Sequence, residues 1–391
     1  MGNPLQDPGF FRDPYPAFAA LRSVSPVQEV PGAGGRSSYL VTGYAEAREA
    51  FTDPRLSKDT AAFFAGKDTG RNLHPAVSRS MLATDPPQHT RLRSLVTKAF
   101  TPGAVARLRP YIATVTDELL DAWVPGEPVD AIEGLAVPLP VTVICQLLGV
   151  PDADRAAVRT WSNELFAAGQ PDRIDSASHA VAGFMADLIA AKRRTPDDSL
   201  LDDLIRARDG EDRLGEDELV SLAVLLLVAG HETTTNLIGN GLLALLRTPD
   251  SLQRLRDEPG LVDPAVDELL RLDPPVSTAT FRFTTEAVSL GGTEIPAGCP
   301  VLIAPGAANR DPARFPDPDR LDLDRDARGQ LAFGHGIHRC LGAPLARAEG
   351  EIALRRIATR FPRLRLAVPG AELHWRHTRL MRGLESLPVL P

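Results

Sequence analysis

Cysteine is scarce in this chain: Cys145, Cys299 and Cys340 are the only three in 391 residues, and they lie far apart with no CxxC pair. An odd number of widely spaced cysteines excludes a disulfide framework and is typical of reduced thiols in the cytoplasm. An excess of basic residues is also missing, because 43 lysines and arginines face 51 acidic residues and the formal net charge is −8. The charge argues against nucleic acid or an anionic membrane as the main partner.

Long apolar runs are missing as well. The longest, residues 219–230, contains Ser221, whereas a bilayer span needs about 20 apolar residues. The N-terminus has no basic segment followed by an apolar one, and Gln6 occupies the position where a myristoylation signal needs serine or threonine. We therefore expect a cytoplasmic protein with no export signal and no membrane anchor.

Helical patterns dominate what is present. They predict helices after Asp85-Pro86-Pro87 up to residue 100 and at 105–123, 138–148, 152–168, 176–194 and 217–246. β-branched or alternating stretches predict short strands at 38–41, 281–285, 287–290 and 301–304. No Gly/Ser linker and no internal repeat divides the chain. The expected fold is therefore mainly α, a single helical domain over residues 1–391 with a small antiparallel β region.

The segment LAFGHGIHRCLGAPLARAE combines a lone cysteine with several glycines and a helix start. Gly334, Gly336 and Gly342 would allow a backbone to approach a flat, bulky group. Pro344 is tolerated in a first helical turn, which places Cys340 at or just before a helix N-terminus. Unpaired N–H groups and the helix dipole lower the pKa of a thiol there, so that a thiolate would be available as a metal ligand or nucleophile.

Two other interpretations of these residues stay open. A free cysteine is often a small buried side chain with no chemistry, and Cys340 fits that description. The second is a zinc site, because His335, His338 and Cys340 lie within six residues and His374 or His377 could complete a tetrahedral set. The spacing of these residues matches none of the usual structural-zinc patterns.

Four motifs in a fixed order resemble those of the cytochrome P-450 family, the haem-thiolate monooxygenases. The cysteine loop matches at Phe333, Gly334, Gly336, Cys340 and Gly342. The other three are AGHETT at 229–234, ELLR at 268–271 and HTRLR at 89–93, and NRDPARFPDPDRLDLDR precedes the loop as in that family. The resemblance spans about 250 residues between the outermost motifs, on a chain of the family's usual size.

The resemblance implies haem b as the cofactor, held between the oxygen-activating helix and the cysteine loop. Cys340 would be the axial ligand of the iron, because a thiolate pushes electron density to the iron and favours O–O cleavage. The remaining residues implied in cofactor binding are His89, Arg93, Arg282 and His338 at the propionates, Ala229 and Gly230 over the haem, and Phe333, Gly334 and Gly342 in the loop.

The same resemblance assigns roles to two pairs of neighbouring residues. Glu232 would supply protons, and Thr233 would take part in oxygen activation. Glu268 and Arg271 would form a buried charge network that supports the haem core and takes no part in the chemistry. The expected reaction is insertion of one atom of O2 into a C–H bond or an alkene.

Electrons would have to come from outside, since the haem fold takes up the whole chain. The resemblance implies a ferredoxin with its NAD(P)H reductase, and a monomeric oxygenase. Candidate contacts for such an acidic donor are Arg91, Lys98, Arg339 and Arg347. Two further hypotheses are a peroxide-driven peroxygenase and a haem-binding sensor or carrier without turnover.

The substrate is expected to be a lipophilic small molecule, either a macrolide-like or polyketide-like secondary metabolite, as for bacterial members that tailor natural products, or a xenobiotic. The family's variable segments are here 60–81, 161–184, 276–280 and the turn at Leu380 and Met381. Candidate pocket residues in them are Phe63, Phe64, Phe166, Val276 and Leu380.

Overall fold

The computed structural model describes residues 9–31, 37–67, 70–166, 170–197, 199–209, 214–378 and 380–391. Three sequence predictions extend beyond them. The interpretation of the N-terminus around Gln6, the end of the helix predicted at 152–168, and residues 68–69 and 167–169 of the variable segments lie outside the described residues.

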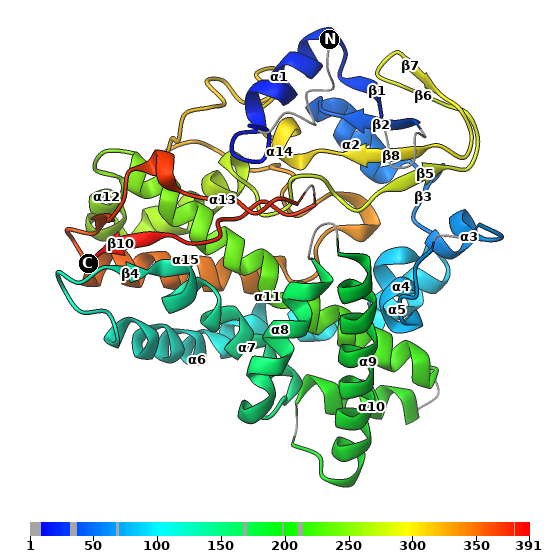
Figure 1. Cartoon of the computed structure of the whole chain (residues 1–391), viewed down its shortest axis with the longest axis horizontal. Helices are drawn as coiled ribbons and strands as arrows, with labels where there is room; N and C mark the ends of the chain where they lie inside the picture. Colours follow the sequence, from blue (N-terminus) through cyan, green and yellow to red (C-terminus); the bar gives the residue numbers. More distant parts are fainter. Residues whose placement is uncertain are drawn as a thin grey trace.

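Helices form most of the described chain, and those predicted from the sequence are present (Figure 1). Their bounds are α1 Tyr15–Val24, α2 Tyr44–Thr52, α3 Thr60–Phe64, α4 Pro75–Ser78, α5 Gln88–Thr97, α6 Pro102–Asp121, α7 Pro138–Leu148, α8 Arg155–Leu165, α9 Pro171–Arg194, α10 Leu200–Asp209, α11 Glu216–Arg247, α12 Ser251–Asp257, α13 Val262–Leu272, α14 Pro305–Ala308 and α15 Ala343–Arg360.

The strands are short and form three small sheets. They are β1 Val27–Pro31, β2 Ser37–Val41, β3 Leu56–Ser57, β4 Val129–Asp130, β5 Arg282–Thr284, β6 Val288–Leu290, β7 Thr293–Ile295, β8 Pro300–Ile303, β9 Arg365–Leu366 and β10 Pro388–Leu390. The largest sheet has the order β1-β2-β8-β5-β3. Pairing is antiparallel, as expected, except that β2 and β8 run parallel, which two strands so far apart in sequence can do because the chain between them is long.

Helix α11 is the centre of the helical part (Figure 1). It is 32 residues long, and it packs against α7, α9 and α15. By length and composition it is the one described helix that could cross a membrane, but 72 % of its apolar window is buried inside the protein. Its apolar character is therefore that of a core helix.

The strand-rich part and the helices meet around β3 and β5. Ser57 of β3 is paired with Phe283 of β5, so that the residue after β3 lies beside Arg282. Helix α5 begins at Gln88, just after Asp85, and the Asp85 carbonyl accepts a hydrogen bond from the His89 N–H at 3.0 Å. This arrangement brings together the end of β3, strand β5 and the start of α5, which are distant from one another in the sequence.

Candidate functional site

The cysteine loop is closed by backbone hydrogen bonds and leads directly into α15. The Cys340 N–H donates to the Phe333 carbonyl at 2.8 Å, and Gly342 is the N-cap of α15 with Pro344 in the first turn, as predicted. Gly334 has φ +68°, a left-handed conformation that glycine adopts without strain. Gly336 also has positive φ, and a Cβ there would meet the Phe51 carbonyl oxygen at 2.9 Å. These two glycines therefore allow the backbone conformation of the loop and its close contact with α2.

Desolvation by the surrounding protein atoms raises the pKa of the Cys340 thiol, although the side chain itself remains accessible. The N–H groups of Gly342 and Ala343 and the guanidinium groups of Arg93 and Arg339 act in the opposite direction, but their effect is smaller. The predicted net lowering of this pKa is therefore wrong in the protein alone, because the helix terminus does not outweigh desolvation. A metal cation at the sulfur reverses the balance, since a coordinating thiol is deprotonated.

The four residues assigned to the propionates include a buried group of unpaired polar atoms. His89 is buried, and both of its ring nitrogens are without a hydrogen-bond partner in the described structure, as is Nε2 of His338. The two imidazole rings lie 4.1 Å apart, and Asp85 is 4.0 Å from His338 Nε2, which is longer than a hydrogen bond. Arg282 of β5 is 3 % exposed. Arg93 lies further out and donates to the Arg339 carbonyl at 2.6 Å.

This donor set fits haem. Buried polar groups are nearly always paired, so unpaired imidazole nitrogens beside a buried guanidinium require acceptors from a bound group. The two carboxylates of haem are acceptors of the right kind, and the side chain of Cys340, which is accessible, offers the soft ligand that iron takes. Cys340 would hold the iron, and His89, Arg282 and His338 would hold the propionates, with Arg93 as a further cation at the outer edge.

The zinc interpretation finds no support. Among the described residues, no three His, Cys, Asp or Glu side chains come together as metal ligands. His377 is stacked instead on Phe11, with ring centroids 4.9 Å apart.

A stripe of α11 is accessible although the helix runs through the core. Ala229 is exposed and Thr233, one turn later, is half-buried, whereas most of their neighbours are buried. The Thr233 hydroxyl donates to the Ala229 carbonyl at 3.1 Å, the four-residue bond expected from the sequence. Gly230 also allows close packing of α11 on α7, because a Cβ there would meet Ile144 at 2.8 Å.

Glu232 is buried and forms an ion pair with Arg376, a residue of the C-terminal segment. Both line a cavity of about 440 Å³ together with Arg159, Asn163 and Glu385. The polar lining connects the carboxylate of Glu232 with a space that is large enough for water molecules. Glu232 thus lines a polar cavity and directly precedes Thr233 of the accessible stripe of α11.

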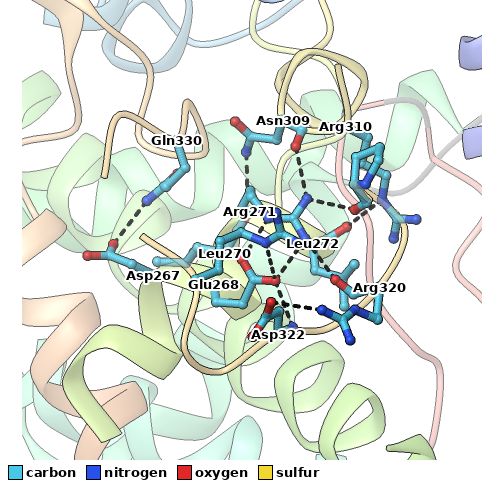
Figure 2. Close-up of polar contacts among 12 residues, drawn as sticks. Asp267, Glu268, Leu270, Arg271, Leu272, Asn309, Arg310, Arg320, Asp322 and Gln330 are labelled. Atoms are coloured by element: carbon cyan, nitrogen blue, oxygen red, sulfur yellow. Dashed lines mark hydrogen bonds and ion pairs between the residues drawn. The ribbon is translucent and has the colours of Figure 1, made fainter. Parts of the chain in front are cut away.

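Glu268 and Arg271 are fully buried, at 0 % exposure each (Figure 2). Arg271 makes two hydrogen bonds to the Glu268 carboxylate, at 2.6 and 2.8 Å, and its remaining N–H groups bond to backbone carbonyls of Asn309, Pro318 and Arg320. The network therefore ties α13 to the segment ahead of the cysteine loop.

The candidate pocket residues fall into three groups. Phe63 and Phe64 pack edge-on against Phe281, with ring centroids 5.6 and 5.9 Å apart. Val276 pairs with Met381 in an isolated bridge next to the hydrogen bond from the Ser277 N–H to the Leu380 carbonyl, so the two variable segments meet. Phe166 lies elsewhere, at the cavity beside Glu232.

The four basic residues suggested as contacts for the electron donor are not equally available for docking. Arg91 is paired with Glu218, and Arg347 is paired with Asp267 at 2.6 Å. Lys98 and Arg339 are exposed.

Three residues of the site were missed by sequence reasoning: Asp85, Arg376 and Lys58. Asp85 was noted only as a helix cap, and its carboxylate accepts a hydrogen bond from Ser57 at 2.5 Å. Arg376 lies beside a predicted variable turn, but no pattern links it to a glutamate 144 positions earlier. Lys58 gave no signal, because an isolated lysine is by default a surface residue.

Comparisons with known proteins agree with this geometry. The family model of cytochrome P450 matches residues 160–366. The chain is 47 % identical to cytochrome P450 107B1 of Saccharopolyspora erythraea over 98 % of this chain and 96 % of that protein. It is 46 % identical to the vitamin D(3) 25-hydroxylase of Pseudonocardia autotrophica, over 97 % and 94 %. The tirandamycin C-bound P450 monooxygenase TamI superposes with a TM-score of 0.92 at 47 % identity, covering 98 % of this chain and 99 % of that one. The chain therefore belongs to the cytochrome P450 family and is a haem-dependent monooxygenase.

Proposed function

We propose that this monooxygenase hydroxylates or epoxidises a lipophilic secondary metabolite of the macrolide or polyketide type, in the cytoplasm, with electrons from a ferredoxin and its NAD(P)H reductase. The observation that carries the proposal is the accessible stripe of α11, where Ala229 and Thr233 interrupt a buried apolar helix beside the acid Glu232. Haem with a thiolate ligand supplies dioxygen activation when it is bound.

The residues around α11 would provide space, hydrogen bonding and proton transfer on the side of the accessible stripe. The small side chain of Ala229 leaves room on the accessible face of α11, and the Thr233 hydroxyl supplies a hydrogen-bonding group there. Glu232 would pass protons from its polar cavity toward that face, with Arg376 holding the carboxylate in place. The aromatic group of Phe63, Phe64 and Phe281 would contribute an apolar wall that excludes water.

The substrate class is supported by the kinds of molecule that similar proteins take. One relative is named for vitamin D(3), and one similar structure contains tirandamycin C. Exposed Lys98, in the turn that follows α5, and exposed Arg339, in the cysteine loop, would face an acidic ferredoxin.

The test is a compound screen followed by turnover. Lipophilic natural products that displace water from the haem of the purified protein are incubated with a surrogate ferredoxin, its reductase and NAD(P)H under isotope-labelled dioxygen. We expect a product with one labelled oxygen atom and NAD(P)H oxidation that depends on the substrate. Turnover with hydrogen peroxide but not with the ferredoxin pair would identify a peroxygenase instead, and no turnover with any bound compound would favour a sensor or carrier.

Replacing Thr233 by alanine is expected to uncouple electron use from product formation. Haem content and spectrum should stay unchanged, because the hydroxyl bonds only to its own helix in the described structure. Product formed per NAD(P)H should fall by about tenfold or more, with hydrogen peroxide released, because a group that directs proton transfer is gone.

Thr234→Ala is the matched control, since its hydroxyl also bonds back along the helix, to Gly230 at 3.4 Å, but the side chain is buried. The control should retain coupling. Equal coupling in the Thr233 variant and the unaltered protein would show that this hydroxyl has no part in oxygen activation.

A further inference from the structure

Lys58 is a buried lysine at the edge of the haem site. It follows β3 directly and is only 4 % exposed, although lysine is among the residues least often buried. The pairing of β3 with β5 places it next to Arg282. Lys58 is therefore enclosed by protein and lies close to Arg282, which is assigned to the haem propionates.

The hydrogen bonds of Lys58 leave its charge uncompensated. The ammonium donates to the Thr280 hydroxyl, a neutral acceptor, and within the described residues no carboxylate lies within 4.0 Å of it. The Asp85 carboxylate is engaged with the backbone N–H of Lys58 at 3.2 Å and with the Ser57 hydroxyl at 2.5 Å. Lys58 thus has spare donors and no direct counter-ion.

Burial, with a smaller contribution from the positive charge of Arg282, lowers the pKa of Lys58 to about 7 against the opposing effect of Asp85. A buried ammonium without a counter-ion is costly to keep. The same desolvation acts on its neighbours: it lowers the pKa of His89 to about 4 and that of Arg282 to about 10. Lys58, His89 and Arg282 together therefore lack a compensating negative charge.

The charges of this group match those of haem when Lys58 is included. Arg93 and Arg282 are cations, His89 is neutral, and Asp85 is the anion that acts on Lys58, His89 and Arg282. Two guanidinium groups and one carboxylate leave one positive charge. The two propionates of haem would turn this into one negative charge, and a protonated Lys58 would neutralise it.

We propose that the Lys58 ammonium binds a carboxylate at the haem site, and that a haem propionate is this carboxylate in the substrate-free protein. The proposal depends on the haem binding that family membership shows, and not on the proposed substrate class. Because Thr280 belongs to the variable segment 276–280, an acidic substrate is a second source of the same group, and the experiment separates the two.

The test compares Lys58→Met with Lys192→Met. Lys192 is equally buried, at 4 % exposure, but is paired with Asp197 at 2.6 Å. Transfer of haem from the ferric protein to excess apomyoglobin gives the rate of haem loss, and urea unfolding of the haem-free protein gives its stability. We expect Lys58→Met to lose haem roughly ten- to a hundredfold faster, because a hydrogen bond to a charged group is gone. Its haem-free form should be at least as stable as the unaltered one.

The control should show the reverse pattern. Lys192→Met leaves Asp197 without its partner, so the haem-free protein should lose stability while haem loss stays unchanged. Lys58→Arg should restore slow haem loss, because it keeps a cation at the site. A merely structural role for Lys58 would lower the stability of the haem-free protein in the methionine variant and would not be rescued in this way.

A second arm identifies the source of the carboxylate. Binding of dodecanoic acid and of its methyl ester is followed by the change in the haem spectrum in both proteins. If Lys58→Met keeps normal haem retention but loses a preference for the acid over the ester, the carboxylate comes from the substrate. Unchanged haem loss together with an unchanged preference would overturn the proposal.

Discussion

The Cys340→Ser variant is expected to lose turnover completely and to lose the optical signature of a thiolate-bound haem. The substitution keeps size and polarity, so the loop should still close through the Cys340 N–H bond to Phe333. A serine hydroxyl has no comparable ability to ionise and to push electron density to iron. Product formation with the ferredoxin pair and the spectrum of the reduced protein with carbon monoxide measure the two effects.

Cys299→Ser is the control for this experiment. Cys299 is half-buried among the strands, and its substitution removes a thiol from the same protein without touching the loop. It should keep both the spectrum and the turnover. A Cys340→Ser protein that still gave the thiolate signature would show that another residue ligates the iron.

The Glu268→Ala variant is expected to lose about 3–5 kcal/mol of stability, enough to lose haem or to prevent folding. Removal of the carboxylate leaves the Arg271 guanidinium at 0 % exposure without its counter-ion. It also takes away the acceptor for the Asp322 N–H at 3.0 Å and for Arg325 at 3.2 Å. Haem content of the purified protein and urea unfolding are the measurements.

An exposed ion pair provides the comparison. Asp326 and Arg328 lie 2.7 Å apart with more than half of each side chain exposed, so Asp326→Ala should cost less than about 1 kcal/mol. Glu268→Gln keeps the shape and part of the hydrogen bonding, and should lie between the two. A Glu268→Ala protein that is folded and retains haem would contradict a supporting role for this network.

Sequence patterns predicted the elements whose signals are local. The helix expected at 138–148 is observed as Pro138–Leu148, and the one expected at 217–246 as Glu216–Arg247, because a long apolar period and clear breakers define both. Helices α1 and α10 were not predicted, since short helices depend on the surfaces they pack against. The parallel pairing of β2 with β8 depends on residues about 260 positions apart, which no local pattern contains.

The same distinction holds for the site. Cys340, Glu232 and Thr233 were predicted because each lies in a short motif, and neighbouring residues in the sequence are enough to indicate its chemistry. Lys58 and Arg376 were not, because each acquires its role from a partner more than 140 residues away: Thr280 in one case and Glu232 in the other. The net direction of the Cys340 pKa was also wrong, since burial is a property of the whole fold.

The most direct test of the account is the absorption spectrum of the reduced, unaltered protein with carbon monoxide. Cys340 as the iron ligand predicts the red-shifted band that is typical of a haem bound to a thiolate. A band typical of histidine ligation, or a protein that stays colourless after expression with ample haem precursor, would contradict it.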